Sequence, residues 1–300
     1  MRVFVASLLT ASLLAACHAS HIQRSDASFD AIVAAPMFTG NGPRLLFDEA
    51  HHNFHRSDGR YAPFVTLMRN DGLTVTANAQ PFTAASLRDH DILVIANAEG
   101  ASTGAPAFTE AEIDAVAGWV EGGGALLLIA DHSPFGRAAD ALSQRFGVAM
   151  LDAHLKDVQH SDPGPSPFFL LFTRENGLLA EHPITKGLDR IVTFGGQALR
   201  VQSPEATLLR LSPDAQIVKD RAKPDISEPV GANAAAAVAL TPGRGRVVIM
   251  GEAAALTAQV LTGEPAKPFG VAELRIGMSR TDIDNKQFAL NIVRWLARRL

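Results

Sequence analysis

The order of apolar and polar residues along this chain of 300 residues alternates between two patterns. Short strand-like runs, several of them apolar throughout, occupy residues 44–47, 73–77, 91–96, 125–130 and 246–250. Segments with apolar residues at helical spacing occupy residues 61–70, 83–89, 109–121, 137–146, 253–261 and 284–300. Strands that are apolar on both faces are typical of a parallel sheet covered by helices on both sides. We therefore predict an α/β domain over residues 43–300.

The middle of the chain, residues 150–242, breaks this rhythm. It is rich in proline and glycine at residues 163–167. Its β-like runs are short and lie at residues 191–194, 206–211 and 235–240. We interpret this part as an irregular insertion together with edge strands of the main sheet.

Residues 1–16 have the character of a signal peptide. Arg2 supplies a positive charge, and residues 3–16 form an apolar run too short to span a bilayer. Cys17 follows two alanines, an arrangement that resembles the bacterial lipobox, in which the cysteine receives a lipid before cleavage. The alternative is an ordinary secretory signal with a chance cysteine. We predict an envelope lipoprotein that is held to a membrane by a lipid on Cys17.

The residues after the cysteine refine this prediction. His18 is not an acidic retention signal of the enterobacterial kind, which favours the outer membrane, with the domain facing the periplasm. Residues 17–42 show little periodicity and are predicted to form a tether that lifts the domain off the membrane.

Composition narrows the possible partners and cofactors. Cys17 is the only cysteine in the sequence, so a lipidated chain has no disulfide and no cysteine nucleophile. Beyond residue 16 there are 26 basic and 31 acidic residues with no evident basic face, which argues against a nucleic-acid partner. No G-x-G-x-x-G follows the first strand and no G-x-S-x-G occurs, so a nucleotide cofactor and a nucleophile-elbow hydrolase are both disfavoured.

Polar side chains that can bind metals or move protons follow the predicted strands, and sites in open α/β sheets gather at those strand ends. The densest group follows the first strand and contains Asp48, His51, His52 and His55. Imidazole and carboxylate ligands suit a divalent metal such as Zn or Mn, with His51, His52 and His55 as candidate ligands. The alternative is that Asp48 caps a helix and the histidines pack or bond to loop backbone.

Two further strand ends deliver candidates to the same edge. Asp131 and His132 follow the fourth run, and Glu252 follows the last one. We predict Asp131 as a metal ligand and Asp48, His132 and Glu252 as catalytic acid–base residues. Each also has a structural interpretation, since Asp131 and Glu252 could cap helices and His132 could pack beneath a loop.

The irregular middle contains another possible cluster. His154, Asp157 and His160 are spaced three residues apart and could form a second metal site. A solvated loop is the interpretation that we favour there.

Several stretches together resemble bacterial proteins with a DUF4350-like domain, within the class I glutamine-amidotransferase-like fold. They are LFDEAH at 46–51, NFH at 53–55, GGG at 122–124, IADH at 129–132, PFG at 134–136, GEAA at 251–254, TAQ at 257–259, DN at 284–285 and NIVRWL at 291–296. The resemblance covers residues 43–300. It implies a flavodoxin-like three-layer sandwich with a mainly parallel sheet, and it carries no general activity.

The sequence departs from true amidotransferases of this fold at one position. Those enzymes use a cysteine nucleophile after a central strand, and the corresponding turn here is Asp131-His132-Ser133. Glutamine hydrolysis by that mechanism is therefore excluded. Some relatives with this fold lack the nucleophile and bind or cleave sugars, which implies a carbohydrate ligand by analogy.

Three functions remain open from the sequence. The first is a hydrolase or lyase, metal-assisted or not, acting on a carbohydrate or another small molecule of the cell envelope. The second is a non-catalytic lipoprotein that binds a ligand or a protein partner on a degenerate enzyme fold. The third is a structural envelope protein whose polar residues only cap helices.

Overall fold

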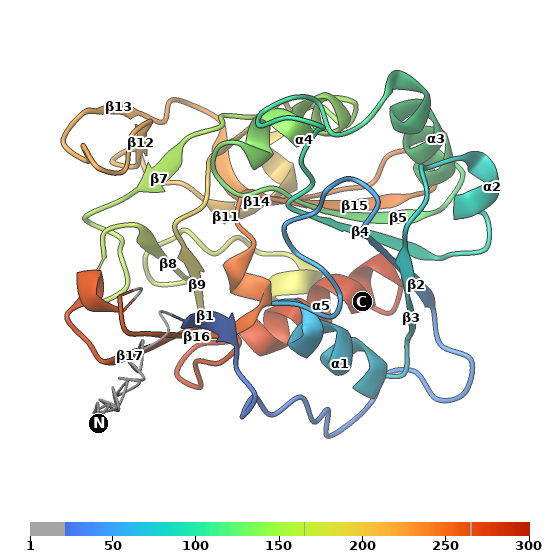
Figure 1. Ribbon diagram of the computed structural model, residues 1–300, viewed down its shortest axis with the longest axis horizontal. Coiled ribbons are helices and arrows are strands. Elements are labelled where there is room, and N and C mark those ends of the chain that lie inside the picture. The colour runs from blue at the N-terminus through green and yellow to red at the C-terminus, as the bar shows by residue number, and fades with distance from the viewer. Residues whose placement is uncertain (1–21, 165, 265) are drawn as a thin grey trace, which may run out of the picture.

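The structure is a computed structural model that describes residues 22–164, 166–264 and 266–300. In it the strand-like runs of the sequence form the parallel part of a nine-stranded sheet (Figure 1). Its order is β3 (Thr74–Asn78), β2 (Arg44–Asp48), β4 (Ile92–Ala96), β5 (Ala125–Ile129), β15 (Arg246–Met250), β14 (Ala234–Leu240), β10 (Leu199–Val201) and β6 (Val148–Met150), with β11 (Thr207–Arg210) paired to β14. The strands from β3 to β15 are parallel to one another, and the remaining pairs are antiparallel. The predicted parallel sheet is confirmed for the strands from β3 to β15, and the antiparallel strands β14, β10 and β11 beyond β15 come from the irregular middle of the chain.

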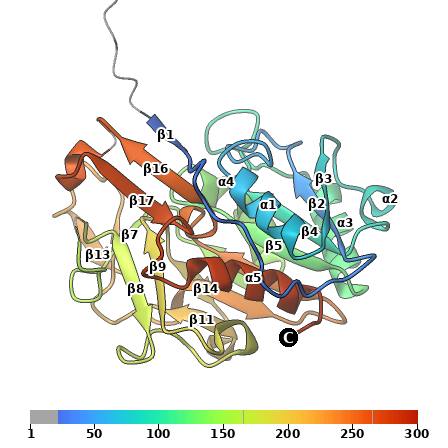
Figure 2. The same ribbon diagram turned by 90° about the horizontal axis from the view of Figure 1, so that it is seen from below.

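Helices cover both faces of this sheet (Figures 1 and 2), so the predicted three-layer α/β fold is confirmed. One face carries α1 (Ala62–Asn70) and α5 (Asn285–Leu296), and the other carries α2 (Ala84–Leu87), α3 (Glu110–Glu121) and α4 (Phe135–Gln144). Successive residues of a strand point to opposite faces. In β4, Val94 accordingly packs in the cluster with α1 and α5, whereas Leu93 and Ile95 pack in the cluster with α3.

The helix boundaries follow from local signals in the sequence. Thr109 caps α3, because its hydroxyl accepts a hydrogen bond from the Glu112 N–H while the Glu112 carboxylate accepts one from the Thr109 N–H. The two residues form a capping box that fixes the start of α3.

Smaller sheets flank the main one. The middle of the chain adds a sheet of β7 (His154–Lys156), β12 (Gln216–Val218) and β13 (Ser227–Pro229), and a hairpin of β8 (Phe169–Thr173) and β9 (Arg190–Phe194). A third sheet joins β1 (Ile22–Ser25), β16 (Ala258–Thr262) and β17 (Glu273–Gly277). Single turns of 3₁₀ helix are η1 (Pro183–Thr185), η2 (Pro204–Ala206), η3 (Ala254–Leu256) and η4 (Lys267–Phe269).

The structure corrects the helix predicted at residues 253–261. Only the turn η3 is helical, and β16 follows it at once. The alanine-rich start has a high intrinsic helix propensity, but β16 pairs with β1 on one side and β17 on the other. Tertiary pairing outweighs the weak local preference here.

The predicted tether is also corrected for residues 22–42. Ile22 to Ser25 form β1, which pairs with β16, and the buried Asp26 forms an ion pair with Arg275. Phe38 is buried in the main hydrophobic cluster. Residues 17–21 lie outside the described part of the chain, and so does the predicted signal peptide.

Candidate functional site

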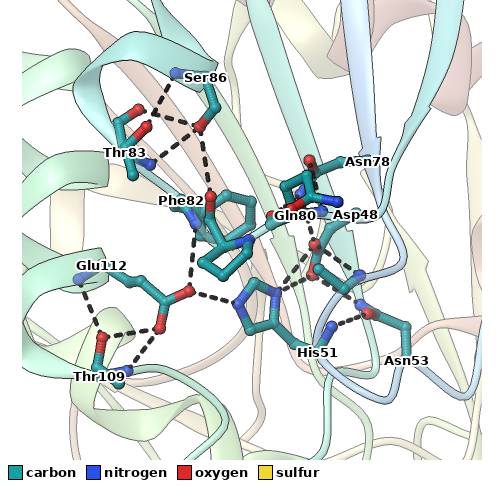
Figure 3. A network of polar contacts seen from close by, with 12 residues as sticks. Asp48, His51, Asn53, Asn78, Gln80, Phe82, Thr83, Ser86, Thr109 and Glu112 are labelled. Atoms are coloured by element: carbon teal, nitrogen blue, oxygen red, sulfur yellow. Dashed lines mark hydrogen bonds and ion pairs between the residues drawn. The ribbon is translucent and has the colours of Figure 1, made fainter.

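The polar residues predicted from the sequence fall into two separate places in the structure. The first is a buried network around His51 (Figure 3). The His51 ring packs against the rings of Phe82 and Phe108, at centroid distances of 4.6 and 4.8 Å. The His51 Nδ1 lies 2.9 Å from Asp48 Oδ2, and its Nε2 lies 2.8 Å from Glu112 Oε1. Each nitrogen of this ring is therefore bonded to a carboxylate.

The charges in this network stabilise one another. Burial by itself lowers the pKa of His51, but the hydrogen bonds and negative charges of Asp48 and Glu112 outweigh it and raise that pKa. Burial raises the pKa of Glu112, but His51 and Thr109 outweigh it and lower that pKa to about 2. The network thus favours an imidazolium, whose two nitrogens both carry protons and offer no lone pair to a metal.

Asp48 is the centre of this network and has a structural role in it. It is completely buried and accepts hydrogen bonds from the side-chain amides of Asn53 and Asn78, at 3.0 and 3.3 Å. These bonds hold the loop that follows β2 against β3 (Figure 3). The catalytic role predicted for Asp48 is therefore not supported by its position, because no solvent or substrate reaches it.

The other two histidines of this segment, His52 and His55, lie outside the network and in different environments. His52 is exposed and has a positive φ of 49°, so its side chain leaves the network. His55 is 4% exposed, and its ring packs on Tyr61 at a centroid distance of 5.0 Å. Burial, assisted by the charge of Arg60, lowers the pKa of His55 to about 3. Its Nδ1 has no hydrogen-bond partner in the described structure.

The second place is a pocket of about 800 Å³, and His55 forms part of its wall. Asn97, Asp131 and Glu252 line it from the carboxyl ends of β4, β5 and β15, which are neighbours in the sheet. Sites in open α/β sheets lie at this edge. The ionisable side chains on its wall are His55, Arg60, Asp131, His132, Arg221 and Glu252.

Asp131 and Glu252 are held by backbone groups. The Asp131 N–H donates to Asn97 Oδ1 at 2.9 Å, and Asp131 Oδ1 accepts from the His132 N–H at 3.0 Å. The Glu252 carboxylate is 2% exposed and accepts from the N–H groups of Ala254 and Ala255, each at 2.7 Å. Glu252 therefore lines the pocket and also accepts hydrogen bonds from the first N–H groups of η3, which begins two residues after it.

The environment raises the pKa values of both carboxyl groups. Burial first, and then the charge of Asp131, raise the pKa of Glu252 to about 8, against the opposing effect of its backbone donors. Burial also raises the pKa of Asp131, although the charges of His132 and Arg221 and hydrogen bonds to the carboxylate oppose this. At neutral pH Glu252 therefore favours its protonated form.

Two glycines make room for Glu252. A Cβ added to Gly196 would lie 2.2 Å from the Gly251 carbonyl oxygen and 2.4 Å from Glu252 Cβ. A Cβ added to Gly251 would lie 2.2 Å from the Gln197 carbonyl oxygen. The segment after β9 thus packs directly on the turn after β15, which fixes the Glu252 side chain from the irregular part of the chain.

His132 is half-buried on the pocket wall, beside Asp131. Its ring centroid lies 4.0 Å from that of His154, whose Nδ1 is buried without a hydrogen-bond partner in the described structure. Burial first, and then the charge of His132, lower the pKa of His154 to about 4. The predicted solvated loop is therefore wrong for His154, which lies in β7 and packs against the ring of His132.

The structure does not bring the predicted metal ligands together. His51 is closed off by two carboxylates, His52 is exposed, and His55 and Asp131 reach the pocket from different strand ends. No group of three or more His, Cys, Asp or Glu side chains within the described residues has an arrangement that could hold a metal ion. The possible second metal site of His154, Asp157 and His160 is not assembled among the described residues either. His160 Nδ1 lies 3.1 Å from Asp157 Oδ2, but His154 packs on His132 instead.

Sequence reasoning missed two pocket residues, Arg60 and Arg221. Arg60 lies just before α1, and Arg221 lies between β12 and β13, far from the strand ends that guided the search. No local sequence pattern marks Arg221 as a pocket residue, because only the folded insertion places it beside the turn after β5.

Comparison with known proteins gives a family and a fold. The model of the family described as a domain of unknown function, DUF4350, matches residues 55–262, and no curated protein matches the sequence. The solved structure of the mmIFT52 N-terminal domain has a TM-score of 0.56 at 13% identity, covering 84% of this chain and 97% of that chain. At that identity the likeness shows a shared fold alone.

Two further solved structures are more distant. A thua-like protein from Bacteroides uniformis has a TM-score of 0.43 at 14% identity, covering 87% of this chain and 94% of that one. A cytoplasmic protein from Salmonella typhimurium has a TM-score of 0.47 at 13% identity, covering 85% and 98%. Within the part of the chain that the structure describes, no helix has the length and apolar character of a bilayer span.

Proposed function

The chain belongs to the family described as a domain of unknown function, DUF4350, and within it we propose an envelope lipoprotein that carries out acid–base chemistry, as a hydrolase or lyase, in the pocket between Asp131 and Glu252. The observation that carries this proposal is a pair of carboxyl groups at adjacent strand ends, the buried Glu252 and the half-buried Asp131, which line one pocket. Two titratable groups that influence each other's pKa in a concave site are candidates for an acid and a base.

The chemistry that such a pair supports is a paired proton transfer. In a hydrolysis, protonated Glu252 gives its proton to the leaving oxygen as the bond to that oxygen breaks. The Asp131 carboxylate takes a proton from the water whose oxygen forms the new bond. In an elimination, Asp131 takes a proton from carbon instead, Glu252 again protonates the leaving oxygen, and no water is consumed.

The substrate that we propose is a carbohydrate or another small molecule of the cell envelope. Six phenylalanines line the pocket and offer ring faces to the C–H groups of a ligand, and Asn97 and Gln259 offer amides on the same wall. The volume of about 800 Å³ lies in the range of small-molecule sites.

The membrane anchor is proposed from the sequence around Cys17. If Cys17 carries a lipid, the chain to the start of β1 at Ile22 spans at most about 18 Å when extended. Gln23 in β1 lines the pocket, so the pocket would open near the membrane surface. Metabolic labelling with a radioactive fatty acid should label the parent protein and leave Cys17→Ser unlabelled; labelling of both would refute the anchor.

The enzymatic proposal is tested by a turnover screen with matched variants. The parent, Asp131→Asn and Glu252→Gln are incubated with a cell-envelope extract and with a set of chromogenic glycosides, and products are followed by mass spectrometry. We expect a product that the parent forms and neither variant forms. A control, Glu121→Gln, changes an exposed carboxylate at the end of α3 and should retain turnover.

A non-catalytic binding protein is the second candidate, and one observation favours it. Both carboxylate oxygens of Glu252 already accept hydrogen bonds from backbone N–H groups, as a purely structural cap would. That candidate predicts no product from the folded parent at any pH between 5 and 9, together with measurable ligand binding that depends on His132. A product lost in Glu252→Gln would exclude it.

A further inference from the structure

Two arginines line the pocket from distant parts of the chain. Arg60 comes from the turn before α1, and Arg221 comes from the loop between β12 and β13. Arg60 is half-buried, whereas Arg221 is exposed at the pocket mouth. Neither residue takes part in the acid–base chemistry proposed above, so their place in the pocket needs another explanation.

Neither arginine has a carboxylate partner in the described part of the chain. No ion pair or hydrogen bond joins either guanidinium to another described residue, although Arg221 lies within electrostatic range of Asp131 and His154. Several partly buried arginines elsewhere in the fold are paired with carboxylates: Arg280 lies 2.6 Å from Asp162, and Arg294 lies 2.6 Å from Asp71. Arg60 is the half-buried member of the pair, and a partly desolvated cation without a counter-charge is costly, which points to a partner that arrives with a ligand. The exposed Arg221 lines the same pocket and can bind that ligand as well.

Each guanidinium lies over an aromatic ring instead. Arg60 Cζ is 4.9 Å from the centroid of Phe54, and Arg221 Cζ is 4.9 Å from the centroid of Phe168. A ring face attracts a guanidinium by a cation–π interaction and leaves the in-plane N–H donors of the guanidinium free to bind other groups. Those donors match the geometry of a carboxylate or phosphate.

Phenylalanine is the commonest residue on the rest of the wall. Six phenylalanines line the pocket: Phe54, Phe135, Phe168, Phe169, Phe194 and Phe269. A ligand that fills this space therefore needs an apolar surface as well as an anionic group. The ionised Asp131 on the same wall would repel a doubly charged phosphate more strongly than a singly charged carboxylate, so a single negative charge fits the pocket better.

We propose that the pocket binds an organic carboxylate with an apolar body, whose carboxylate is held by Arg60 and Arg221 and whose body packs on the phenylalanines. This inference rests on the proposed function, since it names the substrate class of the same pocket. In this arrangement the carboxylate of the ligand lies at the two arginines, and the bond that reacts lies near Asp131 and Glu252.

The test uses two probes of the same shape and different charge, 4-phenylbutyrate and 4-phenylbutanamide. Their affinities are measured by calorimetry at low salt on the parent, Arg60→Gln, Arg221→Gln and the control Arg88→Gln, whose arginine lies on the exposed surface beside Asp89. We expect the parent and the control to bind the acid about tenfold or more tightly than the amide. Each pocket variant should lose most of this preference while its affinity for the amide stays within about twofold.

Other outcomes overturn the inference. Equal affinities of the parent for acid and amide would refute an anionic ligand, and so would a preference retained in both pocket variants. Tighter binding of 2-phenylethyl phosphate than of 4-phenylbutyrate would refute the carboxylate. Asp131→Asn and Glu252→Gln should keep the preference for the acid, so a failure of this inference and an absence of turnover are seen in different measurements.

Discussion

Asp131 and Glu252 occupy equivalent positions on neighbouring parallel strands. Ile129 in β5 and Met250 in β15 are direct partners in the register, and each carboxylic acid lies two residues beyond its member of that pair. Equivalent positions on parallel strands present their side chains at the same height and the same edge. The pairing of the two carboxyl groups therefore follows from the register of the sheet, and not from a flexible loop.

The raised pKa of Glu252 predicts a pH dependence of stability. Its pKa is about 8 in the folded protein and near the ordinary value of 4.5 in the unfolded chain. Between these values the folded state holds one more proton than the unfolded state, so the free energy of unfolding falls as pH rises from 4.5 to 8. In Glu252→Gln this contribution is absent. Urea denaturation at pH 5, 6.5 and 8 should show a steeper decline in the parent, and parallel declines would contradict the raised pKa.

His51 and His55 should titrate in opposite directions although only three residues separate them. Asp48 and Glu112 outweigh burial and raise the pKa of His51, whereas burial lowers that of His55 to about 3. We expect ¹⁵N-edited NMR to show His51 charged above pH 6.5, and the His55 ring neutral down to about pH 4. A His55 ring that protonates near pH 6.5 would show that the pocket is open to water at that side chain.

Loss of the His51 ring should destabilise the fold more than any change to its exposed neighbour. His51→Gln removes the cation between the buried carboxylates of Asp48 and Glu112, and breaking a buried ion pair costs about 3–5 kcal/mol. His52→Gln is the matched control and should change the free energy of unfolding by less than about 0.5 kcal/mol. Similar losses in the two variants, measured by urea denaturation, would contradict the structural role of the network.

Two glycine substitutions should have opposite effects on stability. Gly196→Ala places a Cβ 2.2 Å from the Gly251 carbonyl oxygen, so we expect a loss of about 2 kcal/mol or more. Gly118→Ala adds a Cβ to open space within α3 and should stabilise the protein by about 0.5–1 kcal/mol. Thermal melting of both variants tests this, and a Gly196→Ala protein as stable as the parent would show that the turn after β15 can move.

The sequence predicted the site residues that directly follow an apolar strand. It missed those that only long-range contacts of the folded chain bring to the site. Apolar runs located β4, β5 and β15, and the residues after them led to Asp131, His132 and Glu252. The same logic failed for Asp48 and His51, because Glu112, the residue that closes their network, lies on α3 and no local pattern links it to β2. Arg221 could not be found for the same reason: its loop reaches the pocket only through pairing of β12 with β7.

The central claim is that Glu252 carries a proton at neutral pH beside an ionised Asp131, and infrared spectroscopy of the carboxyl groups tests it most directly. At pH 6.5 the parent should show the C=O absorption of one buried, protonated carboxyl group, and Glu252→Gln should lack that band. Titration to pH 9 should remove the band from the parent. If the parent shows no such band at pH 6.5, both carboxyl groups are ionised, and the pair cannot act as the acid and base of the proposed reaction.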